Sequence, residues 1–122
     1  MLKLGGYGIV RFLPICGNTP ALTALGGVSL GGGLLVRLIC LTQIDIKVLI
    51  AYSSVAHMAF SVMTFSTCSS AGLKGGILVL CAHGISSSAI FFGANVFYKI
   101  RHSRNLVLNK GSNATLPYIL AL

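Results

Sequence analysis

The sequence contains almost no acidic side chains, since Asp45 is the only side-chain carboxylate among 122 residues. Nine lysines and arginines bring the charged residues to only 8% of the chain, against about 25% in a typical soluble domain. So few charges cannot cover the surface of a soluble domain of this length. Apolar residues make up 55% of the chain and its mean hydropathy is +0.90, so the composition predicts a protein that lies in a lipid bilayer.

The scarcity of carboxylates and the spacing of the cysteines exclude several kinds of site. The serine run at 86–88 has no acidic partner on a helix, which nucleophilic catalysis would need. The four cysteines (Cys16, Cys40, Cys68, Cys81) show no Cys-x-x-Cys spacing, so they predict neither a metal site nor an iron–sulfur cluster. No glycine-rich phosphate-binding motif follows a strand pattern. We therefore expect this chain to bind no metal and no cofactor.

The net charge of +8 raises the question of an anionic partner. Nucleic-acid-binding surfaces combine a basic patch with aromatic side chains, and this sequence has no such patch. Most of its basic residues stand near the ends of apolar segments, where they set the orientation of a membrane protein. We therefore predict the lipid bilayer as the environment and no nucleic-acid partner.

Five apolar segments predict an all-α fold, a polytopic bundle of transmembrane helices that forms a single membrane domain over residues 1–122. Their predicted bounds are 1–14, 21–41, 46–65, 73–100 and 116–122. A helix needs about 20 residues to cross the hydrocarbon core, so the three middle segments are complete spans and the two terminal ones are partial. We therefore expect the chain to be an internal fragment of a longer protein.

The distribution of basic residues predicts the orientation of this bundle. The loops at 42–47 and 101–113 lie on the same side if successive helices are antiparallel. This side holds most of the basic residues, namely Lys47, Lys99, Arg101, Arg104 and Lys110. The opposite side has Arg11 and Lys74. The positive-inside rule then places 42–47 and 101–113 in the cytoplasm or the mitochondrial matrix.

Glycine is frequent in the second segment, where Gly27 and Gly31 form a small-xxx-small pattern. Such pairs allow two helices to approach closely in a membrane. The pattern predicts that this face packs against a neighbouring helix.

Three ionisable residues in the apolar segments are candidates for function, because charged groups in a membrane are costly and usually face other helices or water. They are Lys3, His57 and His83. Lys3 is near the start of the chain, where a lysine that extends to the membrane surface is a sufficient explanation. On a helical wheel, His57 shares an arc with serines and a threonine, and His83 lies on a face of small and hydroxyl-bearing residues.

Two interpretations of the histidines stay open on the residues alone. Histidine titrates near neutral pH, and hydroxyls with bound water can carry protons between such groups, which favours a proton relay. A neutral histidine that hydrogen-bonds to a neighbouring helix explains the same positions without transport. The residues favour neither interpretation for His83, and they favour the structural one for His57.

Four blocks of sequence are informative together. They are LKLGGYGIVR at 2–11, QIDIKVLIAYSSVAHM at 43–58, AHGISSSA at 82–89 and YKIRHSR at 98–104. In this order and with these gaps, they resemble the antiporter-like, proton-translocating subunits of respiratory complex I. Within that family, His57 and Ser87 resemble the mitochondrial subunit 4 branch, since the subunit 5 branch usually has glutamine and lysine at these positions.

The resemblance implies a place for the chain in a larger fold. The five segments would correspond to helices eight to twelve of a fourteen-helix protein. Lys3 would be the central lysine of a proton pathway, and His83 a histidine of the same pathway. His57 matches a family histidine whose role is less defined. The acidic partners on the family's other helices lie outside residues 1–122, so this piece would not pump protons alone.

The resemblance also implies partners and a location. The protein would be a core membrane subunit of the respiratory NADH dehydrogenase in the mitochondrial inner membrane, with other membrane subunits of complex I as partners. The loops at 42–47 and 101–113 would face the matrix. NADH and ubiquinone would be used by the whole complex at sites in other subunits, and this chain would bind no cofactor itself.

Two alternatives belong to other functional classes. A subunit of a multi-subunit sodium/proton antiporter shares the ancestry, and dependence of transport on a sodium gradient would distinguish it. A purely structural helix bundle would use His57 and His83 only for hydrogen bonds. Substitution of both histidines would then lower stability and leave transport intact.

Overall fold

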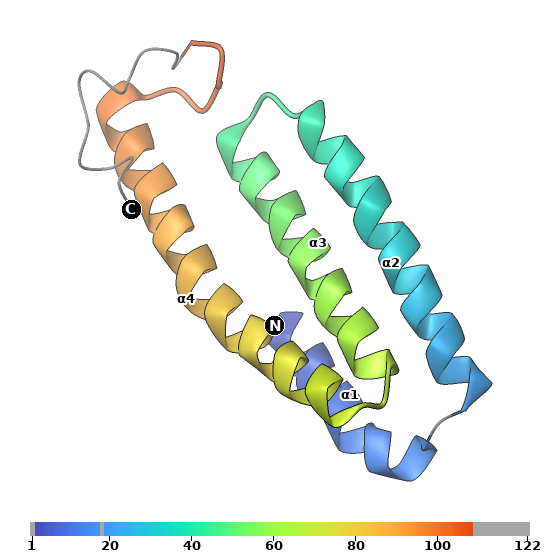
Figure 1. Ribbon diagram of the computed structural model, residues 1–122. Helices are drawn as coiled ribbons and strands as arrows, with labels where there is room; N and C mark the ends of the chain where they lie inside the picture. Colours follow the sequence, from blue (N-terminus) through green and yellow to red (C-terminus); the bar gives the residue numbers. More distant parts are fainter. Residues whose placement is uncertain (1, 18, 109–122) are drawn as a thin grey trace.

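The computed structural model describes residues 2–17 and 19–108, and this part of the chain consists of helices without a β-strand. The helices are α1 (Leu2–Cys16), α2 (Pro20–Leu41), α3 (Ile46–Ser66) and α4 (Ser70–Arg101), shown in Figure 1. The all-α class predicted from the sequence is confirmed. The predicted fifth segment, 116–122, lies outside the described residues.

Three of these helices are long and apolar enough to cross a membrane, namely α2, α3 and α4. At 1.5 Å per residue they are about 33, 32 and 48 Å long, against a hydrocarbon core of about 30 Å. Helix α1 is only about 22 Å long by the same measure, so it does not cover that thickness.

The helix starts follow from local chemistry. Pro20 is at the first position of α2, where its fixed φ suits the helix and its missing N–H is not needed. Helix α4 begins at Ser70, three residues before the predicted segment 73–100, because the Ser69 hydroxyl accepts a hydrogen bond from the Gly72 N–H at 3.0 Å.

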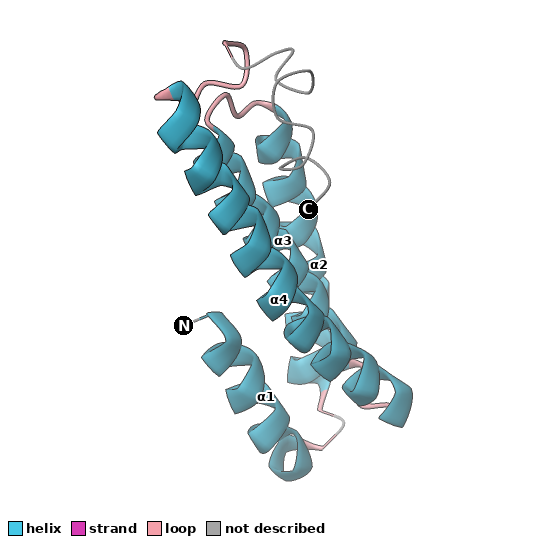
Figure 2. Cartoon of the chain, turned by 90° about the vertical axis from the view of Figure 1, so that its left-hand side faces the viewer, coloured by secondary structure: helices cyan, strands magenta, loops and turns pink. Residues whose placement is uncertain are grey.

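The helices form a layer with one helix on its face. Figure 1 shows α2, α3 and α4 side by side, and Figure 2, turned by 90°, shows α1 beside this layer. Helix α1 contacts α3 and α4. Its first turn lies part-way along the bundle and not at an end. A residue near the start of α1 therefore faces the interior length of α4.

The close approach of α2 and α3 uses glycines other than the predicted pair. A Cβ added at Gly26 would overlap the Ser66 hydroxyl and lie 2.9 Å from the Ser66 Cβ, and one added at Gly33 would lie 3.1 Å from the Cβ of Ala59. In the described part of the chain, nothing lies within 4 Å of a Cβ added at Gly27 or Gly31. That pair therefore makes no close contact with another described helix, and its predicted packing role stays a prediction.

The reason is helical periodicity. Residues 26 and 33 are seven apart, so they lie two turns from one another on one face of α2. The small-xxx-small pair is rotated from that face, because Gly27 follows Gly26 by 100°. A spacing of four residues identifies two small residues on one face, but it does not say which face meets the neighbour.

The packing between α3 and α4 is densest around Phe65. This side chain is 0% exposed, and a Cβ added at Gly76 would overlap its ring. Ser61, one turn before it on α3, is 1% exposed. The absence of a side chain at Gly76 thus lets an aromatic ring of α3 lie against the backbone of α4.

At one end of the bundle, two loops are joined by backbone hydrogen bonds. The Ile46 N–H donates to the Arg104 carbonyl at 3.1 Å, and the Leu106 N–H donates to the Ile44 carbonyl at 2.9 Å. These bonds bring the α2–α3 loop and the segment after α4 to the same end of the bundle, as the antiparallel order of the helices predicts.

Two basic side chains at this end of the bundle lie close to one aromatic ring. The Nζ of Lys47 lies 5.6 Å from the centre of the Tyr98 ring, and the guanidinium carbon of Arg104 lies 4.8 Å from it. A cation over the face of an aromatic ring is attracted by the ring quadrupole. Lys110, the last basic residue predicted for this side, lies outside the described residues.

Candidate functional site

Lys3 lies in the first turn of α1, and its ammonium group rests against the backbone of Gly84 on α4. A Cβ added at Gly84 would overlap the Lys3 Nζ and would lie 3.0 Å from its Cε. The group is directed to the middle of α4 and not to an end of the bundle, where a lysine that extends to a membrane surface would point. The physical reason is that the first turn of α1 lies part-way along the bundle, beside the middle of α4.

The imidazole rings of His57 and His83 lie against each other where α3 meets α4. Their centroids are 5.7 Å apart and their planes are inclined by 33°. In this chain His83 is partly buried and His57 is exposed. A single water can bridge polar groups that are too far apart for a direct hydrogen bond, so the two rings lie within reach of a water-mediated contact.

His83 is the residue at which these contacts meet. It is next in sequence to Gly84, against which the Lys3 ammonium rests, and its ring contacts that of His57. Three helices, α1, α3 and α4, thus bring together the three site residues that were predicted from the sequence.

The hydroxyl groups on the same face of α3 as His57 donate hydrogen bonds to backbone carbonyls of that helix. Ser54 donates to the carbonyl of Ala51 at 2.7 Å, and Thr64 donates to that of Ser61 at 2.7 Å. Ser61 donates to the carbonyl of His57 at 3.3 Å. These protons satisfy backbone acceptors of α3, but each hydroxyl oxygen keeps lone pairs that can accept a hydrogen bond from water.

The arrangement can pass a proton between its members. A lysine ammonium has three donors, and a neutral imidazole has one nitrogen that accepts a proton. The Lys3 ammonium lies beside Gly84, the residue that follows His83, so a bound water could link the ammonium to the imidazole. The second imidazole offers a further acceptor.

Sequence reasoning missed the part played by Gly84. Glycines were interpreted as packing residues, and nothing in the composition separated Gly84 from the others. The one available signal was its position directly after His83 in the block at 82–89. The contact with Lys3 depends on the docking of α1 on α4, which no local pattern reveals.

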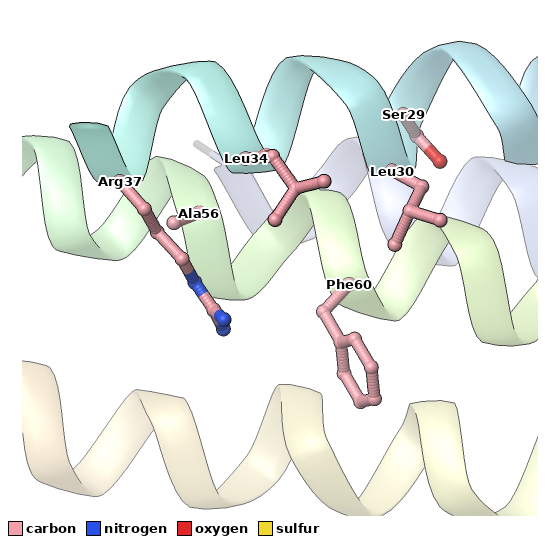
Figure 3. Close-up of a pocket in the computed structure, with 7 residues that line it drawn as sticks. Ser29, Leu30, Leu34, Arg37, Ala56 and Phe60 are labelled. Atoms are coloured by element: carbon pink, nitrogen blue, oxygen red, sulfur yellow. The ribbon is translucent and has the colours of Figure 1, made fainter. Parts of the chain in front are cut away.

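An open groove between α2 and α3 lies apart from these residues. Its lining consists of Ser29, Leu30, Gly33, Leu34, Arg37, Ala56 and Phe60. Figure 3 shows the Arg37 side chain extending from α2 over the groove, with the Phe60 ring further along it. None of the three candidate residues lines this groove, so it does not belong to the candidate site.

Comparisons with known proteins show the family to which this chain belongs. The family described as NADH:quinone oxidoreductase/Mrp antiporter, transmembrane region, matches residues 1–122. NADH-ubiquinone oxidoreductase chain 4 of the snake Crotalus lepidus is 43% identical over 119 residues, which is 96% of this chain and 52% of that protein.

Proteins of the same name from two other animals are also similar to this chain. Chain 4 of the mussel Mytilus edulis is 38% identical over 125 residues, which is 100% of this chain and 29% of that protein. Chain 4 of the hagfish Myxine glutinosa is 40% identical over 119 residues, which is 96% of this chain and 26% of that protein. The chain spans about a quarter to a half of the length of these relatives, and it belongs to the NADH:quinone oxidoreductase/Mrp antiporter transmembrane family.

Proposed function

We propose that this chain is part of a proton-translocating membrane subunit of respiratory NADH–ubiquinone oxidoreductase, of the chain 4 type. The relatives with that name support the proposal, since they match nearly all of the chain at about 40% identity. In this function Lys3 holds and releases a proton, and His83 carries it onward.

One observation supports the assignment of residues most directly. The Lys3 ammonium, which belongs to α1, rests on α4 at the residue beside His83. A lysine that served only to anchor α1 at a membrane surface would extend toward that surface. An ammonium group directed to the middle of another helix lies where a group that exchanges protons with a histidine must lie.

The proposed step is a balanced proton transfer. A proton leaves the Lys3 ammonium, which becomes a neutral amine, and it is taken up by the His83 imidazole, which becomes an imidazolium ion. A change in neighbouring charge drives this step, because each unit of pKa change corresponds to about 1.4 kcal/mol. In the intact protein such a change would come from charges on other helices and subunits, coupled to the quinone reaction.

The proposal also covers the membrane in which the protein lies, its orientation and its partner subunits. The protein lies in the mitochondrial inner membrane beside other membrane subunits of the complex, with the loops at 42–47 and 101–113 on the matrix side. The accumulation of basic residues at that end supports this orientation. NADH and ubiquinone bind elsewhere in the complex, and this chain holds no cofactor.

The test is proton pumping by the assembled complex with the full-length subunit. In proteoliposomes, Lys3→Ala and His83→Ala should each lower the number of protons moved per NADH oxidised. Lys74→Ala is the matched control, because Lys74 is an exposed lysine near the start of α4, far from His83.

Several outcomes would count against the proposal. Normal pumping by Lys3→Ala and His83→Ala would remove the proton role of both residues. Transport that requires a sodium gradient would favour the sodium/proton antiporter that shares this family. Normal transport with lowered thermal stability in the His57/His83 double variant would favour a structural role for the histidines.

A further inference from the structure

Helix α4 has glycines in two different environments. A Cβ added at Gly75 or Gly93 would have no atom within 4 Å in the described part of the chain. A Cβ added at Gly76 would overlap the ring of Phe65, and one added at Gly84 would overlap the Nζ of Lys3. Gly84 is thus the glycine of α4 whose missing side chain is replaced by an ionisable group.

The neighbour of Gly84 differs from that of Gly76 in what it can do when displaced. Phe65 is 0% exposed and has no free space to move into. Lys3 is exposed in this chain and has four rotatable side-chain bonds, so its ammonium can swing away from α4 without unpacking a helix. A side chain at position 84 therefore moves the ammonium and leaves the fold in place.

The docking of α1 on α4 has its own contact one turn away. A Cβ added at Gly6 would lie 3.1 Å from both methyl carbons of Leu80, so the backbone of α1 lies close to the side chain of this residue. Leu80 and Gly84 are four residues apart, on the same face of α4. The Gly6–Leu80 contact holds the helices, and Gly84 leaves room for the side chain of Lys3.

We propose that Gly84 is a positioning residue, which keeps the Lys3 ammonium at the level of His83 by presenting bare backbone to it. This inference rests on the proposed proton role of Lys3 and His83. A side chain at position 84 would lengthen the path between the two groups and change the surroundings of the ammonium, and a larger side chain would do so to a greater extent.

The test uses the assembled complex with the full-length subunit in proteoliposomes. Gly84→Ala should lower the number of protons moved per NADH, and Gly84→Val should lower it further. Gly93→Ala is the matched control, because it makes the same change on the same helix at a position where no described atom lies within 4 Å of the added carbon. Native gels should show equal assembly of Gly84→Ala and Gly93→Ala. If Gly84→Val does not assemble, Gly84→Ala alone decides.

Two further measurements separate positioning from packing. The pH profile of pumping should shift in Gly84→Ala and stay unchanged in Gly93→Ala, because only the first moves an ionisable group. In a Lys3→Ala background, Gly84→Ala should cause no additional loss, since the group that it displaces is absent. An equal loss in both backgrounds would show that Gly84 acts by packing and would overturn the inference.

The outcomes also separate this inference from the proposed function. Normal pumping by Lys3→Ala would refute the proton role itself. Impaired pumping by Lys3→Ala together with normal pumping and an unchanged pH profile in Gly84→Ala would refute only the positioning role.

Discussion

The two histidines of the site have unequal surroundings. His83 is next in sequence to Gly84, on which the Lys3 ammonium rests, and its ring contacts that of His57. His57 contacts His83 alone among these three and is exposed in this chain. Water can take the place of His57, which lies at the edge of the cluster. It cannot replace His83, which lies between the other two groups.

This difference leads to a prediction for conservative substitutions. Glutamine keeps a donor and an acceptor but does not titrate near neutral pH. We expect His83→Gln to lose most of the protons moved per NADH, and His57→Gln to retain most of them. Both variants are measured in the same proteoliposome assay. Equal losses would show that the two rings act as one unit.

The position of Lys3 shows how far residue-level reasoning extends. The sequence identifies an ionisable group in an apolar segment, and it places His57 and His83 on polar arcs of their helices. Which arcs meet is decided by the docking of α1, α3 and α4. The pairing of Lys3 with Gly84 was therefore not predictable from periodicity.

At the scale of helices, the apolar runs predict the elements well, because about 20 apolar residues have few alternatives in a membrane. The ends are harder to predict. Polar residues such as Ser69 extend α4 beyond its apolar run, since a cap needs a hydroxyl and not an apolar side chain. The face of a helix that packs on its neighbour is the hardest feature to predict. On α2 small residues lie on every face, so the spacing of Gly27 and Gly31 does not identify the face that meets α3.

The contact face of α2 gives a prediction with an internal control. Gly26→Ala should destabilise the protein relative to Gly27→Ala by about 1–3 kcal/mol, the usual cost of overpacking. A Cβ at Gly26 would lie 2.9 Å from the Cβ of Ser66, which cannot rotate away, so α2 and α3 must separate. Both variants gain the same helix propensity, so the comparison isolates the contact.

The measurement is thermal unfolding of the purified full-length subunit in detergent. Gly27→Ala should equal or exceed the wild type, because nothing described lies within 4 Å of the added carbon. A Gly26→Ala variant as stable as Gly27→Ala would contradict the assignment of this face.

At the scale of the whole molecule, the two loops that carry most of the basic residues lie at one end. The backbone bonds between Ile46 and Arg104 and between Leu106 and Ile44 join these loops, which the antiparallel order of the helices had placed on one side. At the opposite end, the Cys68 thiol lies 3.8 Å from the carbonyl of Gly17. Most of the basic residues lie at the first of these two ends, and the end with Cys68 and Gly17 has few charged residues.

The proposed orientation in the mitochondrial inner membrane predicts which positions can be labelled from each side of that membrane. In a variant without native cysteines, Leu106→Cys should react with an impermeant maleimide in inside-out particles only. Thr19→Cys, at the start of α2, should react in mitoplasts only. Both residues are exposed, and detergent should make both reactive. The reverse pattern would invert the proposed orientation.

Lys3 and His83 are proposed to act in series on one proton path, and a double-mutant cycle distinguishes this from independent roles of the two residues. Protons moved per NADH are measured in proteoliposomes for Lys3→Ala, His83→Ala and the double variant, all in the full-length subunit. Residues that act as a unit are non-additive, so the double variant should lose no more than the more impaired single variant. Losses that multiply in the double variant would contradict the claim.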